Sequence, residues 1–264
     1  MAGEDDLLDS LFQEPEDFYQ PEKPATHVEY RLHSGDTIAL RLVGHSPLWR
    51  DAALLTGREG HYLWNAGKVI ADYLEQRGSE LVKGKTILEL GAGAGLPSIV
   101  CALKGARKVV ITDYPDPDLI ANLRENVRTV LAYNGDPSVT VEGYLWGSSP
   151  DKILSHLDEP SAGFDMLILA DLVFNHSEHS KLVASVQKSL KKSVDARALV
   201  FFTPYRPWLL EKDLAFFEVA RKAGFSVEKT LEKVMDKVMF SEDPGDELLR
   251  RTVFGYELRW VEVS

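Results

Sequence analysis

The 264-residue chain has 41 acidic and 30 basic residues, and this net charge of −11 argues against a broad nucleic-acid-binding surface, which needs clustered Lys and Arg. Its 44% hydrophobic and 27% charged residues are typical of a soluble globular protein, and no apolar run is long enough to cross a bilayer. A single cysteine, Cys101, excludes an intramolecular disulfide and a cysteine-based zinc cluster.

Residues 1–24 differ in composition from the rest of the chain. They contain eight acidic residues but only one basic residue, Lys23, together with three prolines, which favours a disordered segment. The beginning, MAGEDDLLDS, lacks the basic region and apolar core of a secretory signal, so we expect a cytoplasmic protein. The length suits one α/β domain over residues 25–264, and we expect it to act as a monomer.

The first elements precede the centre of the domain. Residues 28–32 and 37–43 alternate in polarity around Ser34-Gly35-Asp36, which predicts a β-hairpin. Residues 61–76 carry apolar side chains at helical spacing, with Gly78 beyond the end, and predict a helix.

The stretch KTILELGAGAGLPSIVCALKGARKVVITD, residues 85–113, reads as strand, glycine turn, helix and strand. We expect the strands at 87–90 and 108–112 and the helix at 96–106. The glycines let the backbone approach a ligand closely, and the following helix directs free N–H groups towards it. Asp113 follows the second strand, where a carboxylate can accept hydrogen bonds from a ribose diol.

The chain continues with alternating helices and strands. Asp116 or Asp118 can begin a helix that ends near Leu131, and residues 139–145 form the third strand. Trp146 follows it, where it could stack on an adenine ring or fill the core.

The fourth strand, residues 164–170, is almost wholly apolar, as expected of a sheet covered on both faces. Further elements follow as a helix at 178–192, a strand at 199–203, a helix at 209–223 and two strands at 227–234 and 253–261. No helix is expected between the last two strands, which we predict to be an antiparallel edge pair. This order predicts an α/β fold with a doubly wound, mostly parallel seven-strand sheet and a small N-terminal hairpin.

Several motifs carry a family resemblance. The turn ELGAGAG, residues 89–95, resembles motif I of the seven-strand S-adenosylmethionine-dependent methyltransferases. LWNAG at 63–67, TDYPDPDLI at 112–120, LW at 145–146 and LADLVFNHSEH at 169–179 are similar to fungal members that methylate the N-terminal amine and adjacent lysine of translation elongation factor 1-alpha. Such proteins have also been labelled nicotinamide N-methyltransferase-like.

The resemblance implies S-adenosyl-L-methionine as cofactor and elongation factor 1-alpha as the protein partner. It also implies a set of cofactor-binding residues: Trp64, Gly91, Ala92, Gly93, Gly95, Asp113, Tyr114, Trp146 and Ala170.

Methyl transfer from a sulfonium to nitrogen is a direct displacement, which needs alignment and a neutral amine more than a covalent nucleophile. An α-amine has a pKa of about 7.7–8.0 and a lysine about 10.4, so a lysine needs more help from the enzyme to lose its proton and become neutral. Asp171 is the candidate that orients the cationic amine, and Asn175 or His176 could accept a hydrogen bond or relay its proton. His176 could equally be a capping or surface residue. Related lysine methyltransferases carry D-x-x-Y here, whereas this chain has Phe174 after Asp171.

Three other functions stay open. A small-molecule, nicotinamide-like N-methyltransferase uses the same cofactor, an NAD-dependent oxidoreductase uses a similar turn, and a non-catalytic scaffold has the cofactor-binding fold without the reaction. The dinucleotide fingerprint G-x-G-x-x-G fits poorly, because Leu96 stands where its third glycine would fall. A metal is not suggested, since the histidines form no compact ligand set beyond His176 and His179.

Overall fold

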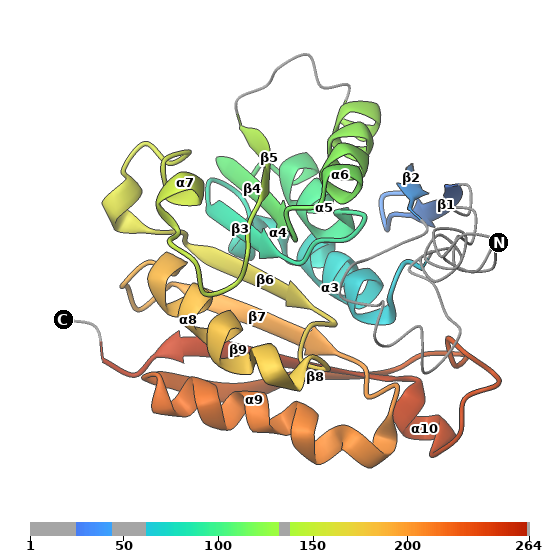
Figure 1. Ribbon diagram of the computed structural model, residues 1–264. Helices are drawn as coiled ribbons and strands as arrows, with labels where there is room; N and C mark the ends of the chain where they lie inside the picture. Colours follow the sequence, from blue (N-terminus) through green and yellow to red (C-terminus); the bar gives the residue numbers. More distant parts are fainter. Residues whose placement is uncertain (1–24, 44–61, 132–137, 263–264) are drawn as a thin grey trace, which may run out of the picture.

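Seven strands form one sheet in the order β5-β4-β3-β6-β7-β9-β8 (Figure 1). The structure, a computed structural model, describes residues 25–43, 62–131 and 138–262, so the predicted disorder of residues 1–24 lies outside it. The strands are β3 Thr86–Leu90, β4 Lys108–Asp113, β5 Val139–Gly143, β6 Met166–Ala170, β7 Arg197–Phe202, β8 Phe225–Val234 and β9 Thr252–Trp260. The first five pair in parallel, and β9 lies antiparallel between β7 and β8. The predicted doubly wound sheet and its antiparallel edge pair are confirmed.

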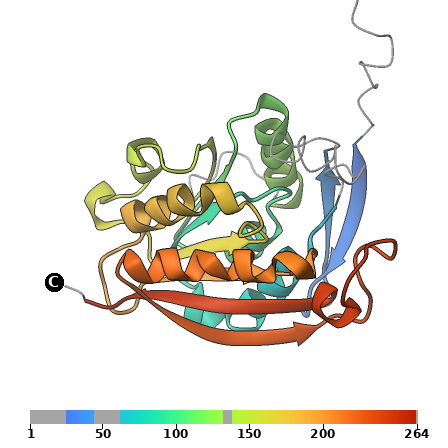
Figure 2. The same cartoon turned by 60° about the horizontal axis from the view of Figure 1, so that its bottom comes forward.

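Helices cover both faces of this sheet. One face carries α3 Asn65–Gln76, α4 Gly78–Leu81, α5 Leu96–Leu103 and α6 Pro117–Val130. The other carries α7 Asp151–Leu154, α8 His179–Ser189 and α9 Leu210–Lys222, and Figure 2 shows α9 lying along the terminal strands. Short 3-10 turns occur at η3 Pro160–Ala162, η4 His176–Glu178 and η5 Pro207–Leu209. None of the helices in the described ranges is long and apolar enough to cross a membrane.

The sheet separates two apolar cores because successive side chains of a strand point to opposite faces. In β4, Val109 and Ile111 pack with α3, α5 and α6, whereas Val110 packs with the helices of the other face. Cys101 on α5 is fully buried in the first core, as expected of a small apolar side chain.

The helix boundaries differ from the predicted ones at several points. The helix expected from residue 61 begins at Asn65, because Trp64 has an extended backbone with φ −65° and ψ 151°. The helix expected at 96–106 ends at Leu103. The one-turn helices α4, α7 and α10 (Glu247–Arg250) were not predicted, since four residues are too few to show helical periodicity. The expectation of no helix between β8 and β9 was therefore wrong.

The predicted hairpin consists of β1 Thr26–Arg31 and β2 Thr37–Leu42 and docks on α6. Asn126 on α6 makes the closest link: its Oδ1 accepts from Arg41 N at 2.8 Å, and its Nδ2 donates to Arg41 O at 2.9 Å. The same Nδ2 donates to Ala94 O at 3.0 Å, in the glycine turn. One buried amide therefore joins the hairpin, α6 and the turn after β3.

Candidate active site

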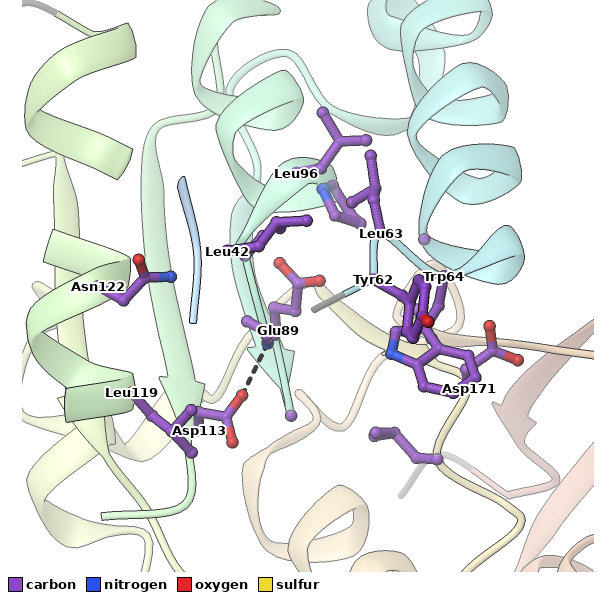
Figure 3. A pocket seen from close by; sticks show the side chains of 18 of the residues that line it. Leu42, Tyr62, Leu63, Trp64, Glu89, Leu96, Asp113, Leu119, Asn122 and Asp171 are labelled. Atoms are coloured by element: carbon purple, nitrogen blue, oxygen red, sulfur yellow. Dashed lines mark hydrogen bonds between the residues drawn. The ribbon is translucent and has the colours of Figure 1, made fainter. Parts of the chain in front are cut away.

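A pocket opens at the carboxyl ends of β3, β4 and β6, where ligands bind in doubly wound sheets (Figure 3). The chain leaves β3 and β6 in opposite directions at this point, which separates their loops and creates the crevice. Its lining comprises Leu42, Val43, Tyr62, Leu63, Trp64, Gly67, Glu89, Gly91, Ala92, Gly93, Ala94, Leu96, Pro97, Asp113, Leu119, Asn122, Trp146, Ala170, Asp171, Leu172 and Phe174.

The glycines of the turn after β3 serve different purposes. Gly91 has φ +63°, and a Cβ there would lie 2.6 Å from Leu172 and 3.3 Å from Trp146, so this glycine permits close packing. Gly93 has φ +56°, and a Cβ there would meet nothing within 4 Å. Gly93 therefore presents bare backbone to the open pocket, as a close-approach position requires.

Asp113 ends β4 with its carboxylate at the pocket. Oδ2 accepts from Gly93 N at 2.7 Å, drawn as the dashed line in Figure 3, and Oδ1 accepts from Tyr114 N at 2.6 Å. Burial raises the pKa of Asp113, although these two backbone N–H groups favour the ionised form. Each oxygen keeps a free lone pair, so the carboxylate can accept hydrogen bonds from a ribose diol.

Glu89 also lines the pocket, although the sequence predicted no role for it beyond its place in the ELGAGAG motif. Its side chain is 1% exposed, and Oε2 accepts from Ser98 N at 3.1 Å, at the beginning of α5. Burial raises its pKa to about 8. A cation in the pocket would favour the charged form and lower that pKa. The sequence does carry a sign of its role: Glu89 is a carboxylate within the otherwise apolar strand TILEL, and a buried acid without an ion-pair partner is rare.

Asp171 follows β6 in a left-handed conformation, φ +54°, rare for a residue other than glycine. Its Oδ1 accepts from Thr203 N at 2.8 Å, and its Oδ2 accepts from Ala66 N at 3.0 Å and Tyr205 OH at 3.4 Å. Burial raises its pKa to about 7 despite these three donors. The carboxylate thus joins the ends of β6 and β7 to the beginning of α3, within the pocket lining.

The pocket has two distinct ends, as Figure 3 shows. Asp113 lies at one end, and Asp171 lies at the other beside Tyr62 and Trp64. Glu89 lies between them.

Some residues predicted for the site do not reach the pocket lining. Tyr114 contributes its backbone N–H to Asp113 but is 36% exposed, and Gly95 is the N-cap residue of α5. Asn175 begins η4. His176 turns towards α9, where Nε2 lies 2.7 Å from Asp213 Oδ1. The predicted residues that do line the pocket are Trp64, Gly91, Ala92, Gly93, Asp113, Trp146, Ala170 and Asp171.

Other lining residues come from segments that the sequence did not connect to the site. Leu42 and Val43 belong to the hairpin end, and Leu119 and Asn122 to α6. Leu119 lies within the TDYPDPDLI motif, but no local motif marks the other three, because their position depends on how the hairpin docks on α6.

The residues present fit S-adenosylmethionine. Asp113 suits the ribose, Gly93 leaves room for close approach, and the buried carboxylate of Glu89 suits a cationic group such as the methionine ammonium. The apolar walls, including Leu96, Leu119 and Trp146, suit the adenine and the methyl-bearing sulfur. Among the described residues, no group of three or more His, Cys, Asp or Glu side chains could hold a metal ion.

Comparison with known proteins identifies the family. A family model described as lysine methyltransferase matches residues 51–223. The protein N-terminal and lysine N-methyltransferase efm7 of Aspergillus fumigatus is 51% identical, covering 99% of this chain and 98% of the relative. The Schizosaccharomyces pombe protein of the same name is 43% identical, with 98% of each chain covered.

A solved structure from Streptococcus mutans, named a candidate SAM-dependent methyltransferase, has a similar fold. Its TM-score is 0.55 at 12% identity, covering 90% of this chain and 57% of that one. The match to the family model and the identity to full-length relatives lead to one conclusion: this chain belongs to the lysine methyltransferase family.

Proposed function

We propose that this chain transfers methyl groups from S-adenosylmethionine to the N-terminal amine and adjacent lysine of translation elongation factor 1-alpha. The observation that carries the proposal is a single pocket with a ribose-type carboxylate, Asp113, at one end and a second buried carboxylate, Asp171, at the other. The names of the relatives support N-terminal and lysine amines as acceptors. The elongation factor rests on the resemblance of TDYPDPDLI and LADLVFNHSEH, and it implies a cytoplasmic location.

Asp171 has the main role on the acceptor side. S-adenosylmethionine, when bound, supplies an electrophilic methyl group on a sulfonium. With Asp113 and Glu89 holding its ribose and its ammonium, the sulfonium would release that methyl group to the amine lone pair and leave as a neutral thioether. The Asp171 carboxylate holds the incoming amine in line and can take up the proton that the amine loses, because its pKa of about 7 is close to cellular pH.

Asn175 and His176 have a smaller part in this proposal than the sequence suggested. Neither lines the pocket, and His176 is hydrogen-bonded to Asp213 on α9. We therefore give the amine-orienting role to Asp171 alone. Asn175 and His176 would shape the loop after β6 that carries Leu172 and Phe174 to the pocket.

Purified elongation factor 1-alpha with a free N-terminus, the same protein with an acetylated N-terminus, and nicotinamide are the substrates for a direct test. Mass spectrometry should find methyl groups on the N-terminal residue and its neighbouring lysine in the free form, and none on nicotinamide. Asp113→Ala should lose about 1.5–3 kcal/mol of cofactor binding per hydrogen bond and serves as the inactive control.

Each other outcome has a definite meaning. Methylation of nicotinamide with none of either protein would overturn the proposal in favour of a small-molecule enzyme. Equal methylation of the free and acetylated proteins would retain lysine as a substrate and remove the N-terminal amine.

A further inference from the structure

Four aromatic side chains from three separate segments meet at the Asp171 end of the pocket. We call Tyr62, Trp64, Tyr205 and Phe240 the aromatic wall. Phe240 lies 5.0 Å from Tyr62, 5.7 Å from Trp64 and 5.8 Å from Tyr205 between ring centroids. Trp64 lies 6.3 Å from Tyr62 and 5.1 Å from Tyr205. The ring planes cross at 63° to 86°, so adjacent rings meet edge to face.

The aromatic wall is joined to the acceptor carboxylate. Tyr62 and Trp64 line the pocket and lie beside Asp171 in Figure 3. Tyr205 lies outside the lining, donates its hydroxyl to Asp171 Oδ2 at 3.4 Å and accepts from Asn65 N at 3.1 Å. A buried carboxylate and aromatic faces therefore border the same part of the pocket.

Phe240 reaches the wall from the connection between β8 and β9. Arg250, on α10, donates Nη1 to the Phe240 carbonyl at 2.8 Å, and its own side chain is buried. The base of the connection closes through Met235 and Arg251, where Met235 N donates to Arg251 O at 2.7 Å and Arg251 Nη1 donates to Met235 O at 3.0 Å. These hydrogen bonds fix the connection, and the fixed connection holds Phe240 against Tyr62 and Trp64.

The Asp171 carboxylate and the aromatic wall together suit an acceptor ammonium group that gains methyl groups during the reaction. An unmethylated ammonium has three N–H donors for a carboxylate, and each added methyl removes one donor while the positive charge remains. An aromatic face attracts such a cation without needing a donor. A pocket with only Asp171 would hold each successive product less well, whereas the adjoining rings compensate for the lost hydrogen bonds.

We propose that the aromatic wall is a binding site for the methylated ammonium group of the acceptor, and that it allows a second and third methyl group to be added to one amine. Tyr62 and Trp64 contact the cation. Phe240 and Tyr205 are positioning residues that fix the orientation of those two rings. The inference deepens the proposed function, on which it rests, by assigning a residue set to the later methylation steps.

A pair of peptide probes tests the binding site independently of catalysis. One carries an N-terminal trimethylammonium-acetyl group, and the other carries the neutral 3,3-dimethylbutanoyl group, which has the same shape with carbon in place of nitrogen. Calorimetry on the full chain with S-adenosylhomocysteine should give binding of the cationic probe about fivefold tighter or more than the neutral one. Tyr62→Leu and Phe240→Leu should reduce that preference to the part that the Asp171 carboxylate supplies, whereas Tyr62→Phe and Phe240→Tyr should keep it.

The second readout is the methylation state of the elongation factor N-terminus. In Tyr62→Leu the share of trimethylated termini should fall at least about threefold relative to monomethylated ones. Trp208→Leu is the matched control, because Trp208 is an aromatic residue that is 59% exposed near the same connection but lies outside the wall.

Failure of this inference differs from failure of the proposed function. Equal affinity for the two probes in the wild-type chain, or an unchanged product distribution in Tyr62→Leu, would overturn the aromatic site while leaving the methyltransferase assignment intact. A wild-type chain that selects the cationic probe but never methylates the elongation factor would overturn the substrate and retain the site.

Discussion

Asp171 combines an unusual backbone with an unusual environment. A left-handed conformation is tolerated by Asp better than by most residues, yet it still carries strain that surrounding contacts must offset. Hydrogen bonds from Thr203, Ala66 and Tyr205 to its carboxylate, and from its own N–H to Phe201 O at 2.8 Å, provide those contacts. These hydrogen bonds therefore hold the Asp171 carboxylate in one position, at the point where β6, β7 and α3 meet.

Titration of this carboxylate should be visible in ligand binding. The trimethylammonium probe has no group that titrates near neutrality, so any pH dependence comes from the protein. Burial sets the pKa of Asp171 at about 7, and the ionised carboxylate adds its attraction to that of the aromatic rings, so affinity should rise by up to about tenfold from pH 6 to pH 8.

The control for this prediction is Asp171→Asn, which keeps the size of the side chain. It should flatten the rise through pH 7. A wild-type affinity that is constant between pH 6 and pH 8 would contradict the prediction.

Gly93 offers a second test at the scale of one residue. Gly93→Ala places a methyl group in open pocket space at φ +56°, so cofactor affinity should fall at least about tenfold by calorimetry. Gly84→Ala is the matched control: it has a similar backbone, φ +72°, and nothing within 4 Å, but it lies before β3 at the opposite end of that strand. Similar losses of thermal stability with different cofactor affinities would identify the Gly93 effect as contact with the ligand.

Among the elements, the hairpin was predicted correctly, but the sequence made no prediction of where it docks. Alternating polarity around Ser34-Gly35-Asp36 is a local signal, and β1 and β2 follow it closely. The contact of β2 with α6 depends on the backbone of Arg41 and the side chain of Asn126, 85 positions apart, which no local pattern links. The same reason explains why Leu42 was missed as a pocket residue.

Removing the Asn126 amide should weaken the contact between the hairpin, α6 and the glycine turn. Asn126→Ala leaves the Arg41 N–H and the carbonyls of Arg41 and Ala94 without that partner, so the free energy of unfolding should fall by about 1–3 kcal/mol. Chemical denaturation measures the loss, and cofactor affinity should fall with it because Ala94 lines the pocket. Thr129→Ala, on the exposed side of α6, should change stability by no more than about 0.5 kcal/mol.

At the scale of the whole molecule, the fold was predictable and the pocket was predictable only in part. Apolar runs alternating with helical patterns determine a doubly wound sheet, and that sheet places its ligands after β3, β4 and β6. Gly93, Asp113 and Asp171 could therefore be found from the sequence. Tyr62 and Phe240 could not, because the connection between β8 and β9 reaches the beginning of α3 only in the folded chain.

Charge is also a property of the whole molecule, and it bears on how a cationic protein terminus approaches. The net charge is −11, and the connection that carries Phe240 continues as SEDPGDE, with Glu242 and Glu247 exposed. Attraction between exposed charges is screened within about 10 Å at 0.1 M salt, so KM for the elongation factor should rise at least about threefold from 50 to 500 mM salt. The value of kcat should change little, because the amine is already seated in the buried part of the pocket when transfer occurs.

Two double variants locate the charge that matters. Glu242→Gln with Glu247→Gln should raise KM at low salt and reduce its salt dependence. Asp195→Asn with Glu228→Gln removes the same charge at the opposite end of the sheet, where β7 and β8 begin, and should change neither. Equal effects of the two variants would mean that net charge attracts the substrate from a distance. An effect of the first variant alone would mean that the terminus approaches past the β8–β9 connection, beside the aromatic wall.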